Sequence, residues 1–204
     1  MPAKNRNLHG SVPDKSGTAL LLIDVINPLS FPEAGQLSRF IPRMARNLSR
    51  LKARAKKAGI PVIYVNDNFG RWRSDFRHQI EHCLKQESAA ADLVKLLRPE
   101  PSDYFVLKPK HSGFFATTLE TLLRYLGARR LILTGIAGNF CVLFTGNDAY
   151  MRDYELIVPQ DCVISNTVAE NRQALQLMRK FLKADIRNST RISFRGSNKR
   201  RGRL

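Results

Sequence analysis

This sequence has few cysteines, histidines and acidic residues, and it lacks any long apolar run. Its 204 residues include three cysteines, four histidines and 17 acidic residues, against 34 basic ones. Three cysteines without a CxxC pair are too few for a disulfide framework and are typical of reduced thiols in the cytoplasm. No apolar run approaches the ~20 residues of a membrane helix. The N-terminus has no apolar segment of the secretory kind, so we expect a cytoplasmic protein with no membrane partner.

The shortage of acidic residues leaves a large positive charge, much of it at the C-terminus. The formal net charge is +17, and residues 187–204 supply seven basic residues and no acid, which leaves +10 on residues 1–186. Residues 197–203 include no apolar side chain that could anchor them, so we predict a basic, disordered tail over residues 195–204. Such a tail suits nucleic acid or an acidic partner, contacted through residues 187–204, whereas a solvated end is the alternative.

Strand-like and helix-like segments alternate along the chain. Continuous apolar runs predict strands at residues 18–24, 60–65, 104–108, 131–133 and 154–158, with a possible edge strand at 186–194. Apolar residues at helical spacing predict helices at residues 37–58, 93–97, 117–126 and 168–182, and another that begins near Cys141. This alternation predicts one α/β domain with a mainly parallel central sheet and helices on both faces, a Rossmann-like three-layer fold. We assign the domain to residues 16–194, after an N-terminal extension of residues 1–15.

The segment at residues 131–142 combines an apolar strand, a glycine-rich turn and a cysteine at the start of a helix. Gly135 and Gly138 allow a sharp bend, and Asn139 is expected to cap the helix that follows. Cys141 would then lie in the positive field of the helix N-terminus, which favours the reactive thiolate. A merely buried cysteine is the alternative interpretation of this segment.

Three chemically reactive residues follow the ends of predicted strands. Asp24, Lys108 and Cys141 all stand at the carboxyl ends of strands, which is where parallel sheets bind their ligands. A carboxylate within reach can take the thiol proton, a lysine can offset the negative charge, and backbone N–H groups of the turn can hold an oxyanion. Singly, Asp24 could cap a turn and Lys108 could be a solvated strand end; their shared location favours a site.

The chain resembles the isochorismatase-like cysteine hydrolases, which include nicotinamidase and N-carbamoylsarcosine amidohydrolase. The matching segments, in family order over roughly residues 18–194, are residues 20–27, residues 108–119, residues 134–142 and Asp161 before Cys162. The resemblance implies an Asp-Lys-Cys triad formed here by Asp24, Lys108 and Cys141. It also implies a cis peptide before Ala137, with the N–H groups of Ala137 and Cys141 directed at an oxyanion.

Two departures from the family narrow the expected activity. Nicotinamidases place a metal-binding Asp-x-His pair after the second strand, but here Asp67 is followed by Asn68 and Phe69, which are poor ligands. His78 and His82 have helical i, i+4 spacing but no convincing third ligand, so we expect neither a metal nor a cofactor. Isochorismatase proper, which cleaves a vinyl ether, generally lacks the cysteine, and Cys141 therefore favours the amide-type hydrolases.

These observations predict a hydrolase that cleaves a C–N bond of a small amide, ureide or carbamoyl compound through a thioester on Cys141. Asp24 would act as general base and then acid, and Lys108 as electrostatic partner. The family habit also suggests a homo-oligomer. A non-catalytic interaction protein that binds nucleic acid or an acidic partner through its tail is the alternative function. Six residues are candidates for the substrate pocket, with ordinary packing as the alternative for the aromatic ones: Asn27, Asn68, Phe69, Trp72, Phe76 and Phe114.

Overall fold

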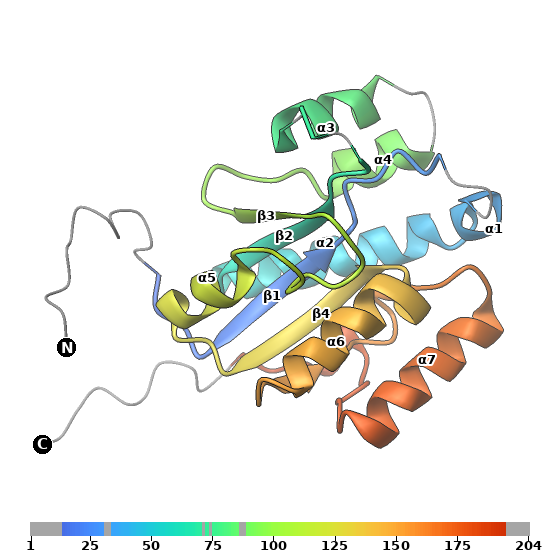
Figure 1. The fold of residues 1–204 in the computed structure, drawn as a ribbon. Helices are drawn as coiled ribbons and strands as arrows, with labels where there is room; N and C mark the ends of the chain where they lie inside the picture. The colour runs from blue at the N-terminus through green and yellow to red at the C-terminus, as the bar shows by residue number, and fades with distance from the viewer. Residues whose placement is uncertain (1–13, 31–33, 71, 74, 86–88, 195–204) are drawn as a thin grey trace, which may run out of the picture.

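A parallel sheet runs through the centre of the molecule (Figure 1). The structure, a computed structural model, describes residues 14–30, 34–70, 72–73, 75–85 and 89–194. The strands follow the order β3-β2-β1-β4-β5, with β6 also pairing with β4, and each pairing is parallel. Their bounds are Thr18–Ile23 for β1, Val62–Asp67 for β2, Tyr104–Lys108 for β3, Arg130–Ile136 for β4, Glu155–Ile157 for β5 and Val163–Ile164 for β6.

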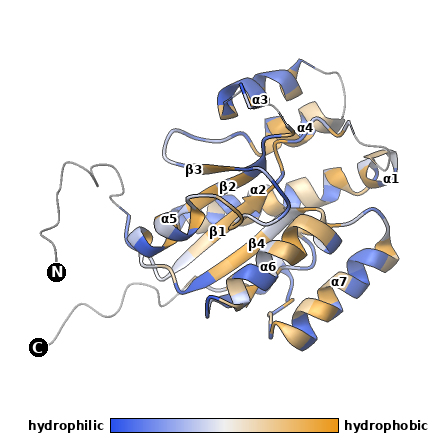
Figure 2. Ribbon diagram, viewed as in Figure 1, coloured by the Kyte–Doolittle hydropathy of each residue, from blue (hydrophilic) through white to orange (hydrophobic). Residues whose placement is uncertain are grey.

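Helices cover both faces of the sheet, because both faces are apolar. Alternate residues of β1 enter different cores: Leu20 and Leu22 pack against one set of helices, and Leu21 packs against the other. The first set is α1 (Ala34–Ser38), α2 (Ile41–Lys57), α3 (Phe76–Leu84) and α4 (Ala89–Leu96). The second set is α5 (Leu119–Leu126), α6 (Leu143–Tyr150) and α7 (Val168–Phe181). Figure 2 shows apolar residues along the central strands and mixed character along α7.

These layers confirm the predicted α/β class, and most predicted elements have a counterpart. The predicted helix at residues 37–58 is divided into α1 and α2, because Pro42 occupies the first turn of α2, where a missing N–H is tolerated. Gly127 ends α5 with a left-handed φ of 74°, and a capping box between Thr167 and Glu170 begins α7. The two-residue strand β6 was not predicted, since two residues show no periodicity.

The possible edge strand at residues 186–194 is wrong. This segment contains a single turn of 3-10 helix, η2 (Ser189–Arg191), and only Asp185 before it forms an isolated bridge, with Ile157. In this segment, side chains form hydrogen bonds with backbone groups that a strand would use to pair with its neighbour. Arg54 donates to the carbonyls of Ser189 and Ile192, and the Asp161 carboxylate accepts from the Ser189 N–H at 2.7 Å.

The predicted N-terminal extension and the basic tail lie mainly or wholly outside the described residues. Residues 14–15 of the extension are described, whereas residues 1–13 and 195–204 are not. Among the helices that are described, none has the length and apolar character needed to cross a membrane.

Gly135 allows β4 to approach β1 closely at the sheet end that will position the site. It pairs with Ile23 in the parallel register and has a φ of 110°, which residues with a Cβ rarely adopt. A Cβ at this position would lie 2.0 Å from the Ile23 carbonyl oxygen, which belongs to backbone and cannot move aside cheaply. A glycine is therefore required here for two separate reasons.

We expect Gly135→Ala to lower the free energy of unfolding by about 3 kcal/mol or more, because it combines a positive φ with a steric clash in the sheet. Urea denaturation monitored by circular dichroism would measure the change. Gly35→Ala in α1 is the matched control, since nothing lies within 4 Å of the added Cβ and a change below about 1 kcal/mol is expected. Equal losses in the two variants would contradict the argument.

Candidate active site

The sheet brings Asp24, Lys108 and Cys141 together at its carboxyl end. Asp24 directly follows β1, Lys108 is the last residue of β3, and Cys141 lies in a π-helical turn, η1 (Gly138–Val142), after β4. The Lys108 Nζ lies 2.9 Å from the Asp24 Oδ2 and 3.6 Å from the Cys141 Sγ. Because β2 separates β3 from β1, only a long side chain on β3 could reach both groups.

Asp67, at the end of the intervening strand β2, is a fourth member of this cluster. Its Oδ2 lies 3.2 Å from the Lys108 Nζ, and its backbone N–H donates to the Asp24 Oδ1 at 2.6 Å. From its sequence context, Asp67 was expected only as a possible metal ligand. Its position at a strand end, between Asn66 and Asn68, could have predicted that it lies next to Asp24, Lys108 and Cys141.

Asp24 is held in place by contacts on both sides of its backbone. It adopts a left-handed φ of 50°, uncommon for a residue with a side chain and a frequent feature of functional positions. Its N–H donates to the Val65 carbonyl at 3.0 Å. The buried Asn66 side chain then forms two hydrogen bonds with the Ile26 backbone, at 3.1 and 2.6 Å. These bonds fix the chain that leaves β1, and with it the direction of the Asp24 carboxylate.

The turn that bears Cys141 differs from the regular helix start that the sequence predicted. The Ala137 carbonyl accepts from the Phe140 N–H and, across the π turn, from the Val142 N–H. The peptide bond between Ile136 and Ala137 is cis. Asn139 is not the cap: its Oδ1 is buried without a hydrogen-bond partner among the described residues, whereas its N–H donates to the Ser165 Oγ at 3.0 Å.

Thr145 ties the cysteine turn to the loop that follows Lys108. Its Oγ1 donates to the Cys141 carbonyl at 2.7 Å and accepts from the Gly113 N–H at 3.0 Å. Thr145 is completely buried, so these bonds are shielded from water. The Thr145 hydroxyl therefore fixes the distance between the turn that bears Cys141 and the loop that follows Lys108.

Burial controls the protonation of the two acids in the cluster. Burial raises the pKa of Asp24, although Lys108 opposes this effect, and burial followed by the charge of Asp24 raises the pKa of the Cys141 thiol. The raised pKa of Cys141 favours a protonated thiol next to the Asp24 carboxyl group. Burial and Asp24 thus shift the pKa of Cys141 in the direction opposite to the expected effect of the helix start, which favours the thiolate.

Lys108 remains charged although its side chain is fully buried. Burial disfavours its ammonium, but the charges of Asp24, Cys141 and Asp67 together raise the pKa of Lys108. The cluster thus places two carboxyl groups and the Cys141 sulfur around one ammonium. This arrangement leaves Asp24 able to accept a proton from the Cys141 sulfur without Lys108 losing its own.

The residues around Asp67 do not fit a metal ion of the nicotinamidase kind. One Asp67 oxygen contacts Lys108, and the other accepts from the Phe69 N–H at 2.7 Å. Asn68 uses its Oδ1 to accept from the Gly70 N–H. His78 contacts the exposed Asp75 carboxylate instead, at 3.0 Å. Within the described part of the chain, no group of three or more His, Cys, Asp or Glu side chains is arranged to bind a metal.

The six candidate pocket residues have very different surroundings. Asn27 and Asn68 are buried and accept hydrogen bonds from the backbone two residues ahead. Phe76 belongs to one core and stacks on the exposed Phe105, and Phe114 packs against Tyr154 in the other core. Phe69 and Trp72 are exposed, in the loop after Asp67. Their role in substrate binding remains a prediction.

Aromatic rings beside Cys141 were not identified from the sequence. Phe140 directly precedes Cys141. The centroid of its ring lies 4.1 Å from the ring centroid of His111 and 5.4 Å from the ring centroid of Phe144. Phe140 and Phe144 are both more than two-fifths exposed. The helical spacing of positions 140 and 144 was a signal, because it places both rings on one side of the turn. The three residues form an exposed aromatic cluster next to the thiol.

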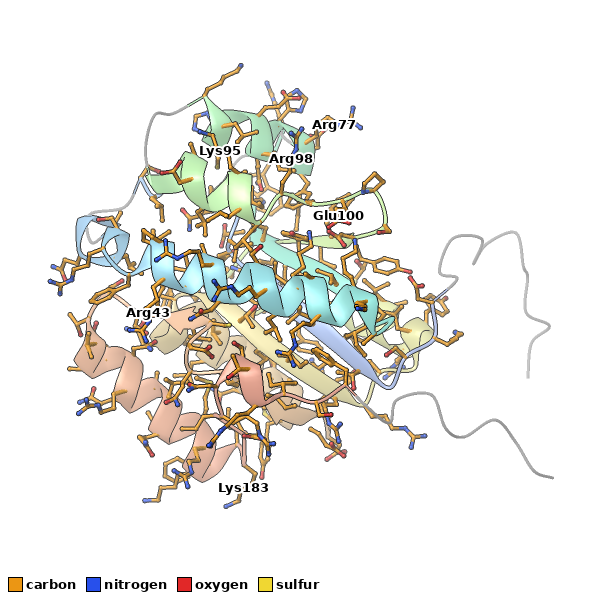
Figure 3. The ribbon with its side chains drawn as sticks, turned by 180° about the vertical axis from the view of Figure 1, so that it is seen from behind. Arg43, Arg77, Lys95, Arg98, Glu100 and Lys183 are labelled. Carbon is orange, nitrogen blue, oxygen red and sulfur yellow. The ribbon has the colours of Figure 1, made fainter. Side chains whose placement is uncertain are left out.

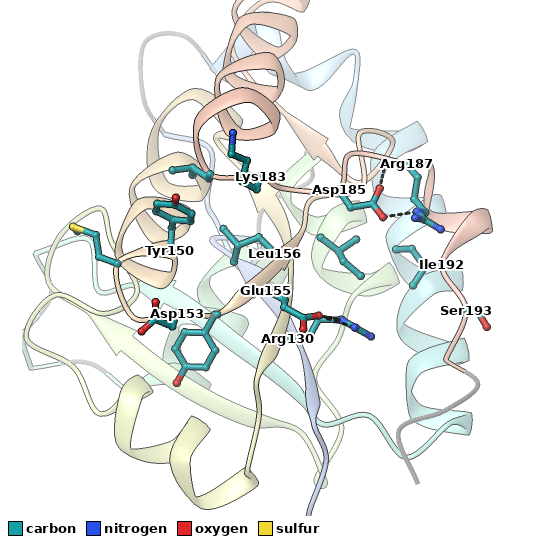
Figure 4. A pocket seen from close by; sticks show the side chains of 14 residues that line it. Arg130, Tyr150, Asp153, Glu155, Leu156, Lys183, Asp185, Arg187, Ile192 and Ser193 are labelled. Carbon is teal, nitrogen blue, oxygen red and sulfur yellow. Dashed lines mark hydrogen bonds and ion pairs between the residues drawn. The ribbon is translucent and has the colours of Figure 1, made fainter. Parts of the chain in front are cut away.

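A large hollow of about 840 Å³ lies elsewhere, against β5. Figure 4 shows Arg130 and Glu155 paired within it, and both residues begin their strands. The hollow is therefore near the amino ends of β4 and β5, whereas Asp24, Lys108 and Cys141 lie at the carboxyl ends. Ligands of parallel sheets bind at the carboxyl ends, so this hollow is not the place for the reaction.

Comparison with known proteins shows relatives of this chain in one family and a shared fold. A model of the isochorismatase domain matches residues 18–187. The uncharacterized isochorismatase family protein YaaI of Bacillus subtilis is 40% identical over 178 residues, which cover 87% of this chain and 97% of that protein. The ureidoacrylate amidohydrolase RutB of Methylobacterium radiotolerans is 33% identical, over 72% of this chain and 67% of its own length. The crystal structure of N-carbamoylsarcosine amidase from Thermoplasma acidophilum has the same fold, with a TM-score of 0.65, 23% identity, and coverage of 86% and 98%.

We expect Asp24→Asn to slow the alkylation of Cys141 by iodoacetamide at neutral pH, by about tenfold or more. The variant lacks the carboxylate that can take the thiol proton when the sulfur attacks, and Lys108 beside the sulfur cannot replace it as a base. Peptide mass spectrometry would follow the labelling, with the buried Cys83 and Cys162 as internal references.

Asp148→Asn is the matched control for this experiment, because Asp148 contacts Ser112 and Arg152 rather than the thiol. It should leave the alkylation rate unchanged. Labelling of Cys141 in Asp24→Asn at the wild-type rate or faster would show that Asp24 is not the base for the thiol.

Proposed function

This chain belongs to the isochorismatase family of hydrolases, and we propose that it uses Cys141 to cleave a C–N bond of a small ureide, carbamoyl or amide compound. The proposal rests above all on one observation. The carboxylate of Asp24, the ammonium of Lys108 and the thiol of Cys141 converge at contact distance at one buried end of the sheet.

In the first step, the Cys141 Sγ attacks the carbonyl carbon of the substrate while Asp24 takes the thiol proton. A protonated thiol next to a buried carboxylate suits this transfer, because the thiolate is needed only when the electrophile is present. The carbonyl oxygen becomes an oxyanion. We assign its stabilisation to the backbone N–H groups of Ala137, directly before the π turn, and of Cys141 within it.

In the second step, the tetrahedral intermediate collapses. The C–N bond breaks, the protonated Asp24 gives its proton to the leaving nitrogen, and a thioester remains on Cys141. Water then attacks the thioester carbon, Asp24 takes a proton from this water, and the C–S bond breaks. The proton returns from Asp24 to sulfur, which restores the thiol and releases the acid product.

Lys108 acts as an electrostatic partner throughout these steps. Its pKa is raised by Asp24, Cys141 and Asp67 against the effect of burial, so it stays cationic while the negative charge moves between carboxylate and sulfur. Asp67 also holds this ammonium in position, because its Oδ2 lies 3.2 Å from the Lys108 Nζ. We therefore assign Asp67 a positioning role and not that of a proton carrier.

The substrate class is proposed from the relatives and from the surroundings of the thiol. RutB, which is 33% identical, is a ureidoacrylate amidohydrolase, and this favours a ureide or carbamoyl group as the first compound to test. The absence of nicotinamidase-type ligands after Asp67 disfavours nicotinamide. The aromatic cluster of His111, Phe140 and Phe144 offers an apolar surface beside the sulfur, as small-molecule sites commonly do.

We expect Cys141→Ala to reduce turnover by about 10⁴-fold or more on any compound that the wild type hydrolyses, because no other nucleophile adjoins Asp24 and Lys108 among the described residues. Ureidoacrylate, N-carbamoylsarcosine and nicotinamide form the panel, and release of amine or ammonia is the measurement. Acid-quenched wild-type enzyme should also contain a substrate-derived mass on the Cys141 peptide.

Cys83→Ala is the matched control, since Cys83 is a buried cysteine in α3 that packs in the core. It should keep its turnover, with at most a small loss of stability. Turnover by Cys141→Ala at the wild-type rate, or a quenched enzyme modified at another residue, would contradict the proposal.

A further inference from the structure

Helix α2 has a uniformly basic outer surface. It contains seven basic residues and no acidic residue, and no aspartate or glutamate occurs in the chain between Glu33 and Asp67. Its apolar side is fully occupied, because Met44, Leu48 and Leu51 are buried against the sheet. The outer side is therefore free to contact a partner without disturbing the core.

Five of these basic residues form one row, here called the basic stripe: Arg43, Arg46, Arg50, Arg54 and Lys57. The spacings of three, four, four and three residues place all five side chains within an arc of about 80° on the helix. All five are exposed. At 1.5 Å per residue, the row is about 21 Å long. Figure 3 shows α2 lying across this face, with Arg43 near one end.

The charge of the stripe is not neutralised by the described part of the protein. No described carboxylate forms an ion pair with Arg43, Arg46, Arg50 or Lys57. Arg54 donates only to the neutral carbonyls of Ser189 and Ile192, so it also keeps its charge available.

The other two lysines of the same helix provide an internal comparison. Lys52 contacts Asp103 at 2.8 Å, and Lys56 contacts Glu100 at 2.7 Å. Lys52 and Lys56 thus form ion pairs with the neighbouring loop before β3. The cations of the basic stripe, which face outwards, have no such acidic partners among the described residues.

The surface next to the stripe extends the same charge. A hollow beside the end of α2 is lined by Arg54, Lys57 and Arg191, and no acidic residue lines it. The chain leaves the described region at Phe194, which lies over the Arg54 guanidinium. Residues 195–204, which follow directly, contain five basic residues and no acid.

We propose that the basic stripe is a docking surface for the phosphodiester backbone of nucleic acid. A row of four guanidinium groups and one ammonium complements the regular charge of a phosphate backbone, which has about one negative charge per 1.7 Å of duplex axis. The surface contacts phosphates and not base edges, so the binding is independent of sequence.

Two other polyanions fit the stripe less well. A helix that binds an acidic membrane inserts large apolar side chains beside its basic ones. On α2 these side chains face the core, and the exposed positions between the cations are small, such as Pro42 and Ala53. An acidic polypeptide lacks the fixed charge spacing that a rigid row of this length would match.

The stripe is independent of the proposed reaction. None of Asp24, Asp67, Lys108 and Cys141 belongs to α2, and these residues lie at the carboxyl end of the sheet. Loss of the stripe should therefore leave the Cys141 chemistry intact, and loss of the cysteine should leave nucleic-acid binding intact.

The test replaces three arginines at once, as Arg43→Gln, Arg46→Gln and Arg50→Gln, in the full chain. Fluorescence anisotropy would follow binding to a labelled DNA duplex of about 20 base pairs and to a labelled single strand of equal length, in salt between about 50 and 200 mM. We expect the triple variant to raise Kd at least about tenfold at the lowest salt. The slope of log K against log salt should fall in magnitude by about three, one for each lost phosphate contact.

The matched control removes three exposed cations from α7, as Arg172→Gln, Arg179→Gln and Lys180→Gln. It has the same net charge as the test variant. Its Kd should stay within about threefold of the wild-type Kd, and its salt slope should differ from the wild-type slope by no more than about one. Tight binding to either duplex or single strand supports the proposal, and the ratio identifies the preferred form.

Equal weakening by the two triple variants would overturn the proposal, because it would assign binding to net charge alone. Absence of binding by the wild type at the lowest salt would overturn it as well. Polyglutamate and vesicles of phosphatidylglycerol with phosphatidylcholine are the competing probes. Stronger binding to either than to both oligonucleotides would replace nucleic acid by an acidic polypeptide or a membrane as the partner.

Discussion

Lys108 is a buried cation, and the arrangement of the whole sheet end depends on keeping its charge compensated. An ammonium without exposed surface is stable only next to negative groups, and Asp24 and Asp67 provide them at 2.9 and 3.2 Å. These carboxylates come from two further strands, so the ion cluster links three neighbouring strands of the sheet. Because Cys141 adjoins the same ammonium, the protonation of its thiol depends on this cluster too.

The backbone around the cluster is shaped to permit this convergence. Gly135 lets β4 lie so close to the Ile23 carbonyl that a residue with a Cβ would clash with it. The buried Asn66 fixes the chain after Asp24, and Thr145 joins the Cys141 turn to the loop after Lys108. Each contact links segments that are distant in sequence: Asn66 is 40 positions after Ile26, and Thr145 is 32 positions after Gly113. The proposed chemistry thus depends on hydrogen bonds that are not themselves part of the reaction.

The strong positive charge of the chain is unevenly organised. Lys52 and Lys56 of α2 are neutralised by Glu100 and Asp103 and join the helix to the loop before β3. The row from Arg43 to Lys57 on the same helix has no such partners among the described residues. One group ties the helix to the neighbouring loop, and the other forms the surface that we propose for nucleic acid.

Local pattern in the sequence determined the α/β class, the main strands and helices, and the positions of Asp24, Lys108 and Cys141 at strand ends, because apolar periodicity and turn residues act over a few residues. It did not determine the contacts across strands. The ion pair of Asp67 with Lys108, the uncapped π turn at Asn139 and the side chains that displace a strand at residues 186–194 all depend on neighbours far along the chain. Tertiary structure alone decided the protonation of Cys141, since burial, which raises the pKa of its thiol, exists only after the sheet and helices have packed.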